Sequence, residues 1–322
     1  MKKIYLILSV FAIVFTACET DFDVNAEWEE TTVVFGLLDL AKDTQFIKIS
    51  KAFLGETDAL QMAQYADSIN FNDGELDVKM IRLRNNRDNT DTITLIESKI
   101  SRGEGVFNDS IMIFTFENNT FLNSTFEYEL LIKNNVTGNS VSSTTEIIKG
   151  FNFSQGIPIS NRLVFYVDQF GFRFPRFEWS SVNSPDAEIF QFNLIFHYKE
   201  NEVEKELLWT QAVLGSDDDI LILSGEDFFH KFLANSLDAL DDDEEREFMS
   251  IDIEMTLGTQ DLKTYIAVNE PITGIVQERP QFTNINNGIG LFSSRYTRLY
   301  SGLSISEDSE NYIIDELGLN FK

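Results

Sequence analysis

Few residues of this chain have side chains suited to nucleophilic or acid–base chemistry. It contains one cysteine, Cys18, and two histidines in 322 residues. His197 falls on the polar side of an expected strand and His230 on the flank of an expected helix, so we expect two solvated surface histidines. The sequence has no Gly-x-Ser-x-Gly elbow, no His-Glu-x-x-His pair and no Gly-rich phosphate-binding loop. It therefore predicts no catalytic residue and a protein that is not an enzyme.

Carboxylates are the one abundant reactive group. Asp and Glu number 53 against 25 Lys and Arg, which gives a net charge of −28. The acidic runs 217–219 and 241–245 lack the spaced oxygens and the turn glycine of a calcium loop. We therefore expect solvated loops there, with neither metal nor cofactor. Nucleic acid phosphates repel a chain of this charge, so no nucleic-acid partner is expected.

The N-terminus accounts for the single cysteine. Lys2 and Lys3 precede the apolar run Ile4–Phe15 and the small residues at 16–17, which is the three-part pattern of a secretory signal peptide. The run is too short for a membrane span, which needs about 20 apolar residues. We expect residues 1–17 to be a signal peptide, and its removal takes away two lysines and leaves a net charge of −30.

The residues FTAC (15–18) resemble the lipobox of bacterial lipoproteins, whose cysteine is acylated and becomes the new N-terminus. The resemblance implies that Cys18 is the lipidation site and that residues 18–29 form a lipidated tether. Two or more acyl chains hold a protein firmly on a membrane. With its only thiol acylated, the chain must fold without a disulfide.

Period-two alternation, typical of strands, dominates residues 30–149. About seven short strands with little helix between them predict an immunoglobulin-like β-sandwich. The alternation slips at Met80–Ile81, where we expect a β-bulge, and Glu56–Ala66 is expected to form a short helix. The predicted strands are Thr32–Leu38, Phe46–Phe53, 76–84, 92–95, Ile111–Phe116, 127–133 and Val141–Ile148.

Residues 150–161, with two glycines and a proline, are predicted to link this domain to a second one over 162–322. Strand alternation returns at 190–198 and 251–257, so the second domain is also predicted to be an immunoglobulin-like or fibronectin-like β-sandwich. It carries one helical insertion, predicted over 224–237 with Ser224 as its cap. The expected buried stripe of this helix is Phe228, Phe229, Phe232, Leu233 and Leu237.

The stretch FGFRFPRFEW (170–179) combines alternating aromatics with two cations that are rare in this acidic chain. One interpretation is a strand that fills the sandwich core, with Pro175 at an edge or bulge. The other is a partner-binding patch, since aromatics and arginine are enriched at interface hot spots. The alternation favours the core, and the patch stays an alternative. Its residues are Phe170, Phe172, Arg173, Phe174, Arg176, Phe177 and Trp179.

The mature chain resembles a large group of Bacteroidota outer-membrane lipoproteins of unknown function. The resemblance lies in FTAC, in ETDFDVN (19–25) and TTVVFGLLD (31–39), and in QFTNINNGIGLFSSRY (281–296) with its N-x-x-x-G-x-G-x-F signature. It implies two immunoglobulin-like units, attachment to outer-membrane lipid through Cys18, and association with a TonB-dependent receptor. No catalytic residue is implied. The acids around Thr20 and Phe22 resemble a surface-export signal, so the cell surface is favoured over the periplasmic face.

Three short motifs match the Asp-Ser/Thr-apolar acceptor of O-glycosylation in that phylum. They are DSI (67–69), DTI (91–93) and DSI (109–111), which make Ser68, Thr92 and Ser110 candidate modification sites. The same tripeptides also begin strands and turns, so this alternative stays open.

Together these patterns predict a non-enzymatic, lipid-anchored cell-envelope binding or accessory protein. One alternative is a glycan-type hydrolase that uses paired carboxylates and needs no histidine. Such an enzyme would show a cleft with two acids and a sugar-stacking aromatic. The other alternative is a structural or adhesive surface lipoprotein.

Overall fold

The computed structural model describes residues 31–52, 69–84, 89–101, 110–157, 160–180, 186–215, 219–238, 244–270 and 281–322. These residues form a mainly β protein with one large mixed sheet, one smaller antiparallel sheet and a few short helices. The prediction of a mainly β chain is confirmed. Cys18, the expected helix Glu56–Ala66 and Ser68 lie outside the described residues.

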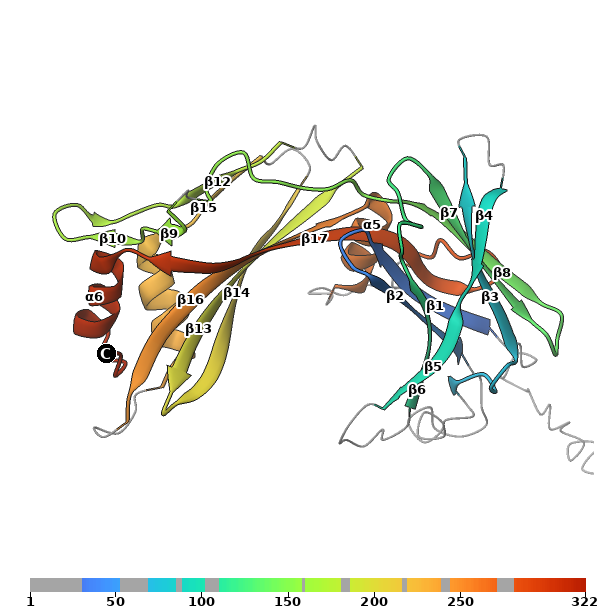
Figure 1. The fold of residues 1–322 in the computed structure, drawn as a ribbon, viewed down its shortest axis with the longest axis horizontal. Coiled ribbons are helices and arrows are strands. Elements are labelled where there is room, and N and C mark those ends of the chain that lie inside the picture. Colours follow the sequence, from blue (N-terminus) through green and yellow to red (C-terminus); the bar gives the residue numbers. More distant parts are fainter. Residues whose placement is uncertain are drawn as a thin grey trace, which may run out of the picture.

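The large sheet has nine strands and runs through the whole molecule (Figure 1). Neighbouring strands are antiparallel, except that β17 pairs in parallel with β1 and with β9. In spatial order the strands are β14 (Val203–Gly215), β13 (Ile189–Glu200), β16 (Arg246–Gly258), β17 (Ile289–Ile305), β1 (Thr31–Asp39), β2 (Thr44–Ala52), β6 (Ser110–Glu117) and β5 (Ile96–Ser101), with β9 (Arg162–Leu163) beside the end of β17.

Strand β17 joins the two halves of the molecule. Phe292 on β17 pairs with Gly36 on β1, and Tyr296, four residues further along, pairs with Leu257 on β16. Residues paired across strands share a face, and residues an even number apart along a strand also share one. Both hydrophobic cores, which contain Phe292 and Tyr296 respectively, therefore lie on the same face of this sheet.

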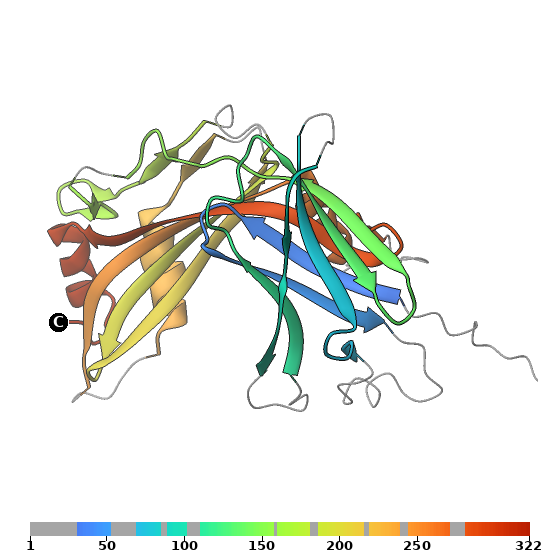
Figure 2. The same cartoon turned by 45° about the vertical axis from the view of Figure 1, so that its right-hand side comes forward.

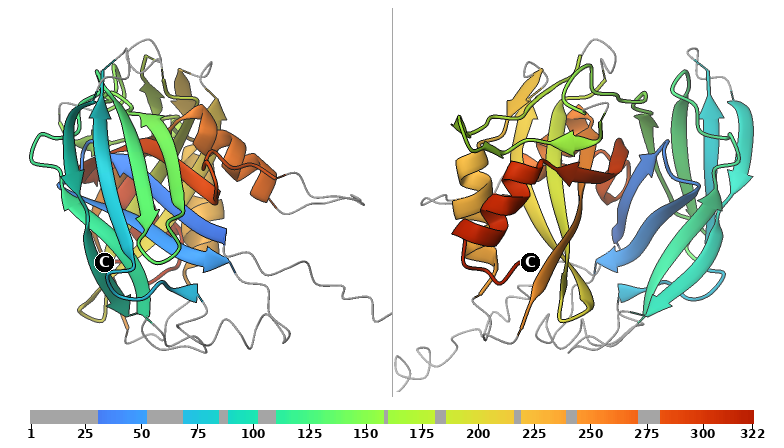
Figure 3. Two further views of the ribbon diagram at one scale, coloured as in Figure 1. Left: turned by 90° about the vertical axis from the view of Figure 1, so that its right-hand side faces the viewer. Right: turned by 60° about the vertical axis from the view of Figure 1, so that its left-hand side comes forward.

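The first core lies between the large sheet and the small one, which is stacked against β1 and β2 (Figure 3). The small sheet is antiparallel, with the order β4 (Asn89–Thr94), β3 (Leu76–Leu83), β7 (Glu127–Asn134) and β8 (Ser140–Glu146). Val34 and Ile47 of the large sheet face Val78 and Tyr128 of the small one. The Tyr128 hydroxyl, fully buried, donates to the Phe121 carbonyl at 2.8 Å, which satisfies its polar end.

The second core is covered by helices and short strands rather than by a second long sheet (Figure 2). Phe190 and Phe192 of β13 lie beneath this layer, which also includes the C-terminal Phe321. The covering elements are the hairpin of β10 (Tyr166–Val167) and β11 (Gly171–Phe172), the pair of β12 (Arg176–Glu178) and β15 (Ile220–Ile222), the π-helix η2 (Asp227–Leu233) with α4 (Ala234–Ser236), and α6 (Glu307–Glu316).

The helix expected over 224–237 is present, with most of its turns in π rather than α geometry. Ser224 caps it by accepting a hydrogen bond from the Asp227 amide at 3.2 Å. Its predicted stripe is buried, and Phe228 stacks on Phe165 with ring centroids 4.0 Å apart.

The expectation of only one helical insertion in this half was wrong. Helix α5 (Gln260–Asn269) covers part of the opposite face of the large sheet, where Leu262 packs on Ile189 and Leu291. Helix α6 begins at Ser306, whose hydroxyl accepts a hydrogen bond from the Ser309 amide, and its first turn is acidic. Both features stabilise a helix N-terminus.

The predicted bulge at Met80–Ile81 was also misplaced. The pairing of β3 with β4 shifts between Arg82 and Leu83, while the pairing of β3 with β7 continues without a shift. Ile81 therefore lies on the outer side of the small sheet, half-buried, and Arg82, paired with the buried Tyr128, lies on the inner side. The division into two domains at 150–161 stays a prediction, since one sheet contains strands from both sides of it.

Candidate binding groove

A hollow of about 530 Å³ lies under the segment that carries β9 to β12. We call it the Arg–Phe groove. It includes four of the seven residues predicted as a partner patch, namely Phe170, Arg173, Phe174 and Arg176. The remaining residues that line it are Gly156, Arg162, Leu163, Val164, Val167 and Pro175.

The groove is cationic on an acidic protein. Three arginines line it, and none of its ten lining residues is Asp or Glu. Arg176 is partly neutralised, since its Nε lies 2.5 Å from Glu178 Oε1. Arg162 and Arg173 are exposed and form no ion pair with any other residue in the described ranges. Two guanidinium groups are therefore available to an anionic ligand.

The apolar part of the groove is exposed as well. Phe170 is 73% exposed and Phe174 64% exposed, and neither ring contacts another aromatic ring among the described residues. Val164, across the groove on the β9 side, is 37% exposed. Large apolar side chains left in water beside unpaired cations are typical of an interaction surface.

The backbone under these exposed side chains is fixed. The Arg173 amide donates to the Phe165 carbonyl at 2.8 Å, and the Arg173 carbonyl accepts from the Gly225 amide at 2.9 Å. Gly225 has to be glycine, because a Cβ there would lie 2.1 Å from the Phe165 carbonyl oxygen. The Pro175 carbonyl accepts from the Leu223 amide at 2.9 Å. The groove therefore rests on a hydrogen-bonded base.

The other three predicted patch residues pack inward. Phe177 and Trp179 are buried, with Phe177 5.0 Å from the Phe192 ring and Trp179 5.6 Å from the Phe190 ring. Phe172 is half-buried, and its ring lies 5.5 Å from that of Tyr312 on α6. The core interpretation thus describes these three residues, and the patch interpretation fits the other four.

Sequence reasoning missed Arg162 and Val164 as neighbours of this patch. They lie on and beside β9, which is placed there by its parallel pairing with the end of β17. Arg162 was identifiable only as one more rare cation near an apolar run, RLVFYV (162–167). Its approach to Arg173 depends on tertiary pairing that has no local signal.

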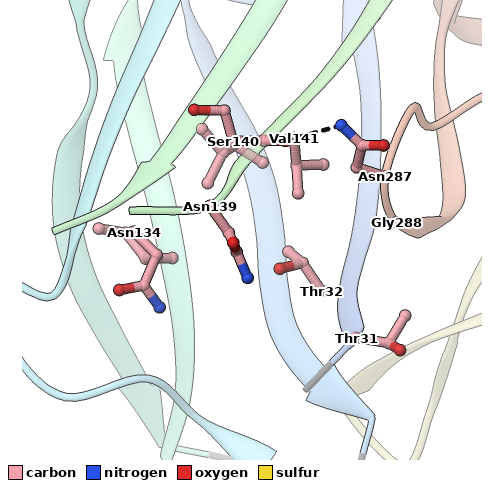
Figure 4. A pocket seen from close by; sticks show the side chains of 10 residues that line it. Thr31, Thr32, Asn134, Asn139, Ser140, Val141, Asn287 and Gly288 are labelled. Atoms are coloured by element: carbon pink, nitrogen blue, oxygen red, sulfur yellow. Dashed lines mark hydrogen bonds between the residues drawn. The ribbon is translucent and has the colours of Figure 1, made fainter. Parts of the chain in front are cut away.

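A second hollow is polar and lies beside the start of β1 (Figure 4). Hydroxyls and amides line it, including those of Thr32, Asn134 and Asn139, and the Asn287 side-chain amide donates to the Ser140 carbonyl at 3.2 Å. No titratable side chain is among its lining residues. The hollow can therefore offer hydrogen bonds but no acid–base chemistry of its own.

Two adjoining hollows, each of about 350–390 Å³, are acidic. Glu127, Glu146 and Asp186 line both, and Glu127 is paired directly with Glu146 across β7 and β8. The aromatic side chain of Phe126 lies at one of them. Lys149 lines the same hollow, and the half-buried ring of Phe126 packs against the first core with the Arg82 guanidinium 5.0 Å from its centroid. Glu188 and Asp261 complete the acidic lining of the other.

The two histidines have separate surroundings. His197 Nε2 lies 3.2 Å from Asp252 Oδ2, and His230 Nε2 lies 3.1 Å from the Tyr312 hydroxyl. His230 is exposed as expected, whereas His197 is half-buried. In the part of the chain that the structure describes, no three His, Cys, Asp or Glu side chains are arranged to hold a metal ion.

The candidate glycosylation residues are only partly described. Thr92 is exposed on β4, an edge strand of the small sheet. Ser110 begins β6, but its side chain is outside the described set. Modification at these positions stays a prediction.

The N-x-x-x-G-x-G-x-F signature has a structural explanation in this chain. The Asn284 side chain accepts from the Phe292 amide at 2.9 Å and donates to the Phe292 carbonyl at 2.7 Å, which closes the loop before β17. Gly290 has a φ of 117°, and a Cβ there would lie 2.0 Å from the Val34 carbonyl oxygen. The motif therefore lets β17 approach β1, and nothing about it requires a ligand.

Among the described residues, no helix is long and apolar enough to cross a membrane. Comparisons with protein families, with curated proteins and with solved structures found no match to this chain.

Proposed function

We propose that this protein is a non-enzymatic, lipid-anchored binding or accessory module of the cell envelope, which contacts its partner through the Arg–Phe groove. The observation that carries the proposal is the groove itself. Two arginines with no ion pair among the described residues and two exposed phenylalanines are held there on a hydrogen-bonded base, in a chain of net charge −28.

The negative charge of the rest of the protein favours the Arg–Phe groove as the place where an anionic ligand binds. At physiological ionic strength, exposed charges more than about 8 Å apart are largely screened. A ligand inside the groove therefore meets mainly Arg162 and Arg173, while the rest of the acidic surface keeps other anionic molecules away. Arginine and aromatic side chains also supply most hot spots of protein interfaces.

The anchor and the location rest on the N-terminal sequence. The leader 1–17 and the lipobox-like FTAC support acylation at Cys18, outer-membrane attachment and, given the acids that follow, display on the cell surface. We propose a TonB-dependent receptor as the partner, from the same family resemblance. The immunoglobulin-like identity of 30–149 belongs to this proposal, supported by two stacked sheets with a shared core.

Photo-crosslinking in cells tests whether the groove contacts a partner. A photoreactive phenylalanine analogue replaces Phe174 in one variant and Phe46 in another. Phe46, 55% exposed on β2, lies outside the groove and serves as the matched control. We expect a discrete crosslink to an envelope protein from position 174 and not from position 46. Equal crosslinking from both positions, or none from 174, would contradict the proposal.

The acidic hollows support one alternative, a carboxylate-dependent glycan hydrolase. Like charges directly opposite each other on neighbouring strands are destabilising, so the Glu127–Glu146 pair calls for a reason. Purified protein and its Glu127→Gln variant would be assayed on envelope glycans. Hydrolysis that is lost in the variant would establish this alternative, whereas no hydrolysis together with a raised Tm would leave the pair without a catalytic role.

A further inference from the structure

We infer that the Arg–Phe groove binds an extended peptide segment that carries acidic side chains next to an apolar one. This inference rests on the proposed function and specifies the chemistry of the partner. It follows from the spacing of the arginines, the exposed phenylalanines and a free strand edge beside them.

The two arginines that have no ion pair among the described residues come from different parts of the segment and favour two separate anionic groups. Arg162 is on β9 and Arg173 follows β11, whereas Arg176 on β12 already pairs with Glu178. An arginine fork matches a carboxylate with two parallel hydrogen bonds. A single small anion would satisfy one of the two forks and leave the other unpaired, whereas a chain with acidic side chains at intervals can reach both.

The apolar lining favours a ligand that carries an apolar group as well as negative charge. Phe170, Phe174 and Val164 are exposed beside the arginines, and the half-buried Pro175 completes the apolar lining. Covering such side chains removes apolar surface from water, which stabilises a complex. Free phosphate has no apolar group to place there. A peptide with an aromatic or aliphatic side chain between two acidic residues has one.

The edge of β9 favours a polypeptide over a lipid or a phosphate ester. β9 pairs with β17 along one side, and the strand order gives it no second neighbour among the described residues. Val164, the next residue, makes no hydrogen bond to any other described residue. A free edge of this kind accepts an extended chain through main-chain hydrogen bonds, and only a peptide carries both those groups and acidic side chains.

An anionic membrane surface is a poor occupant of the same groove. It would bring a plane of negative charge against the whole acidic body, not only against the arginines. A peptide segment enters the groove alone and avoids most of that repulsion.

Binding to a defined peptide tests this inference. The probe is a synthetic dodecapeptide with alternating Glu and Phe and blocked ends, titrated against the purified full-length protein in a neutral detergent. Its matched control has Gln in place of every Glu, which keeps the length and the apolar residues and removes only the negative charge. Inorganic phosphate and glycerol phosphate are titrated in parallel. We expect saturable binding of the acidic peptide, weaker at higher salt, and none of the other three.

Charge-reversed variants locate the binding. Arg162→Glu combined with Arg173→Glu should lower the affinity for the acidic peptide by at least about tenfold, because two charge-assisted hydrogen-bonding forks are replaced by carboxylates that repel the ligand. Arg84→Glu with Lys133→Glu makes the same change of net charge on exposed residues, one just after β3 and one on β7, and should leave binding within about twofold. Unchanged Tm values would show that both proteins are folded.

The outcomes separate this inference from the proposed function. Binding of phosphate or glycerol phosphate without the peptide, or equal loss in both double variants, would overturn the peptide assignment. If position 174 crosslinks a partner in cells while the acidic peptide fails to bind, the binding module stands and the peptide chemistry is wrong. If neither is seen, both fail.

Discussion

The stretch 170–179 contains two groups of aromatic residues with opposite surroundings. Phe177 and Trp179 are buried against β13, while Phe170 and Phe174, only a few residues earlier, are exposed at the groove. All four are large and apolar, so residue type does not separate them. The difference is set by what lies opposite each ring. β12 places its aromatics against the phenylalanines of β13, whereas Phe170 in the β10–β11 turn and Phe174 just before β12 contact no aromatic ring among the described residues.

This contrast separates the base of the groove from its binding surface. The buried pair holds β12 in place, and β12 positions Arg176 and the loop that carries Arg173 and Phe174. Substitutions in the buried group should therefore lower the stability of the fold, and substitutions in the exposed group should lower only binding.

The strongest test of this contrast is to truncate one residue from each group. Phe177→Ala should lower the free energy of unfolding by about 3–5 kcal/mol, because it removes a fully buried ring and leaves a cavity. Phe174→Ala, the matched control, should change it by no more than about 0.5 kcal/mol. Denaturant unfolding measures both, and equal effects would show that the two groups are not distinct.

A smaller loss of stability is expected from adding one methyl group under the groove. Gly225→Ala should cost about 1–3 kcal/mol, since the new Cβ meets main-chain oxygen that cannot move aside easily. It should also weaken acidic-peptide binding, because the Gly225 amide holds the Arg173 carbonyl. Gly150→Ala is the control, with its nearest neighbour at an ordinary 3.6 Å.

If Gly225→Ala melts at the same temperature as the native protein, the base of the groove is adaptable. The groove would then take its final shape when a partner binds. The base would differ less in rigidity from the exposed residues than its hydrogen bonds indicate.

Much of the strand content could be predicted because alternation is local. The seven strands expected before residue 150 correspond to β1, β2, β3, β4, β6, β7 and β8, and those expected at 190–198 and 251–257 correspond to β13 and β16. What the local pattern lacks is the partner of each strand. Strands β1 and β17 pair in parallel although they are more than 250 residues apart in the sequence. Gly290 allows their close approach, but the glycine alone does not indicate which strand approaches it.

The candidate site was predictable to a similar degree. The rare arginines and dense phenylalanines drew attention to 170–179, since that composition is unusual in an acidic chain. The division into buried and exposed members could not be predicted, because Pro175 interrupts the alternation and β15 pairs with β12 from a distant part of the sequence. The α6 helix did have a local signal, Ser306 followed by acidic residues.

A pH-dependent contribution to the stability of the fold is expected at Glu200, which lies outside the Arg–Phe groove. The pKa of Glu200 is lowered by hydrogen bonds from Lys205 and from the buried Arg246, whose Nη2 lies 2.7 Å from Glu200 Oε2. A carboxyl whose folded pKa is lowered contributes stability above its unfolded pKa, and that contribution is lost as the pH falls through the folded pKa.

Glu200→Gln should therefore cost about 1–2 kcal/mol near neutral pH. Its loss of stability on acidification should also be shallower than that of the native protein. Thermal unfolding at a series of pH values below about 5 measures the difference in slope. Glu204→Gln, an exposed residue on the neighbouring strand β14, is the control. Parallel curves for all three proteins would mean that the Glu200–Arg246 contact does not form in solution.

The smallest change in stability is expected where the exposed group is made polar. Phe170→Ser with Phe174→Ser should alter the free energy of unfolding by no more than about 0.5 kcal/mol, because neither ring contacts another aromatic ring in the described part of the chain. The same double variant should reduce acidic-peptide binding strongly, since it removes the apolar half of the groove and leaves all three arginines. A variant that binds normally would show that charge alone holds the ligand, and one that unfolds would show that these phenylalanines belong to the core after all.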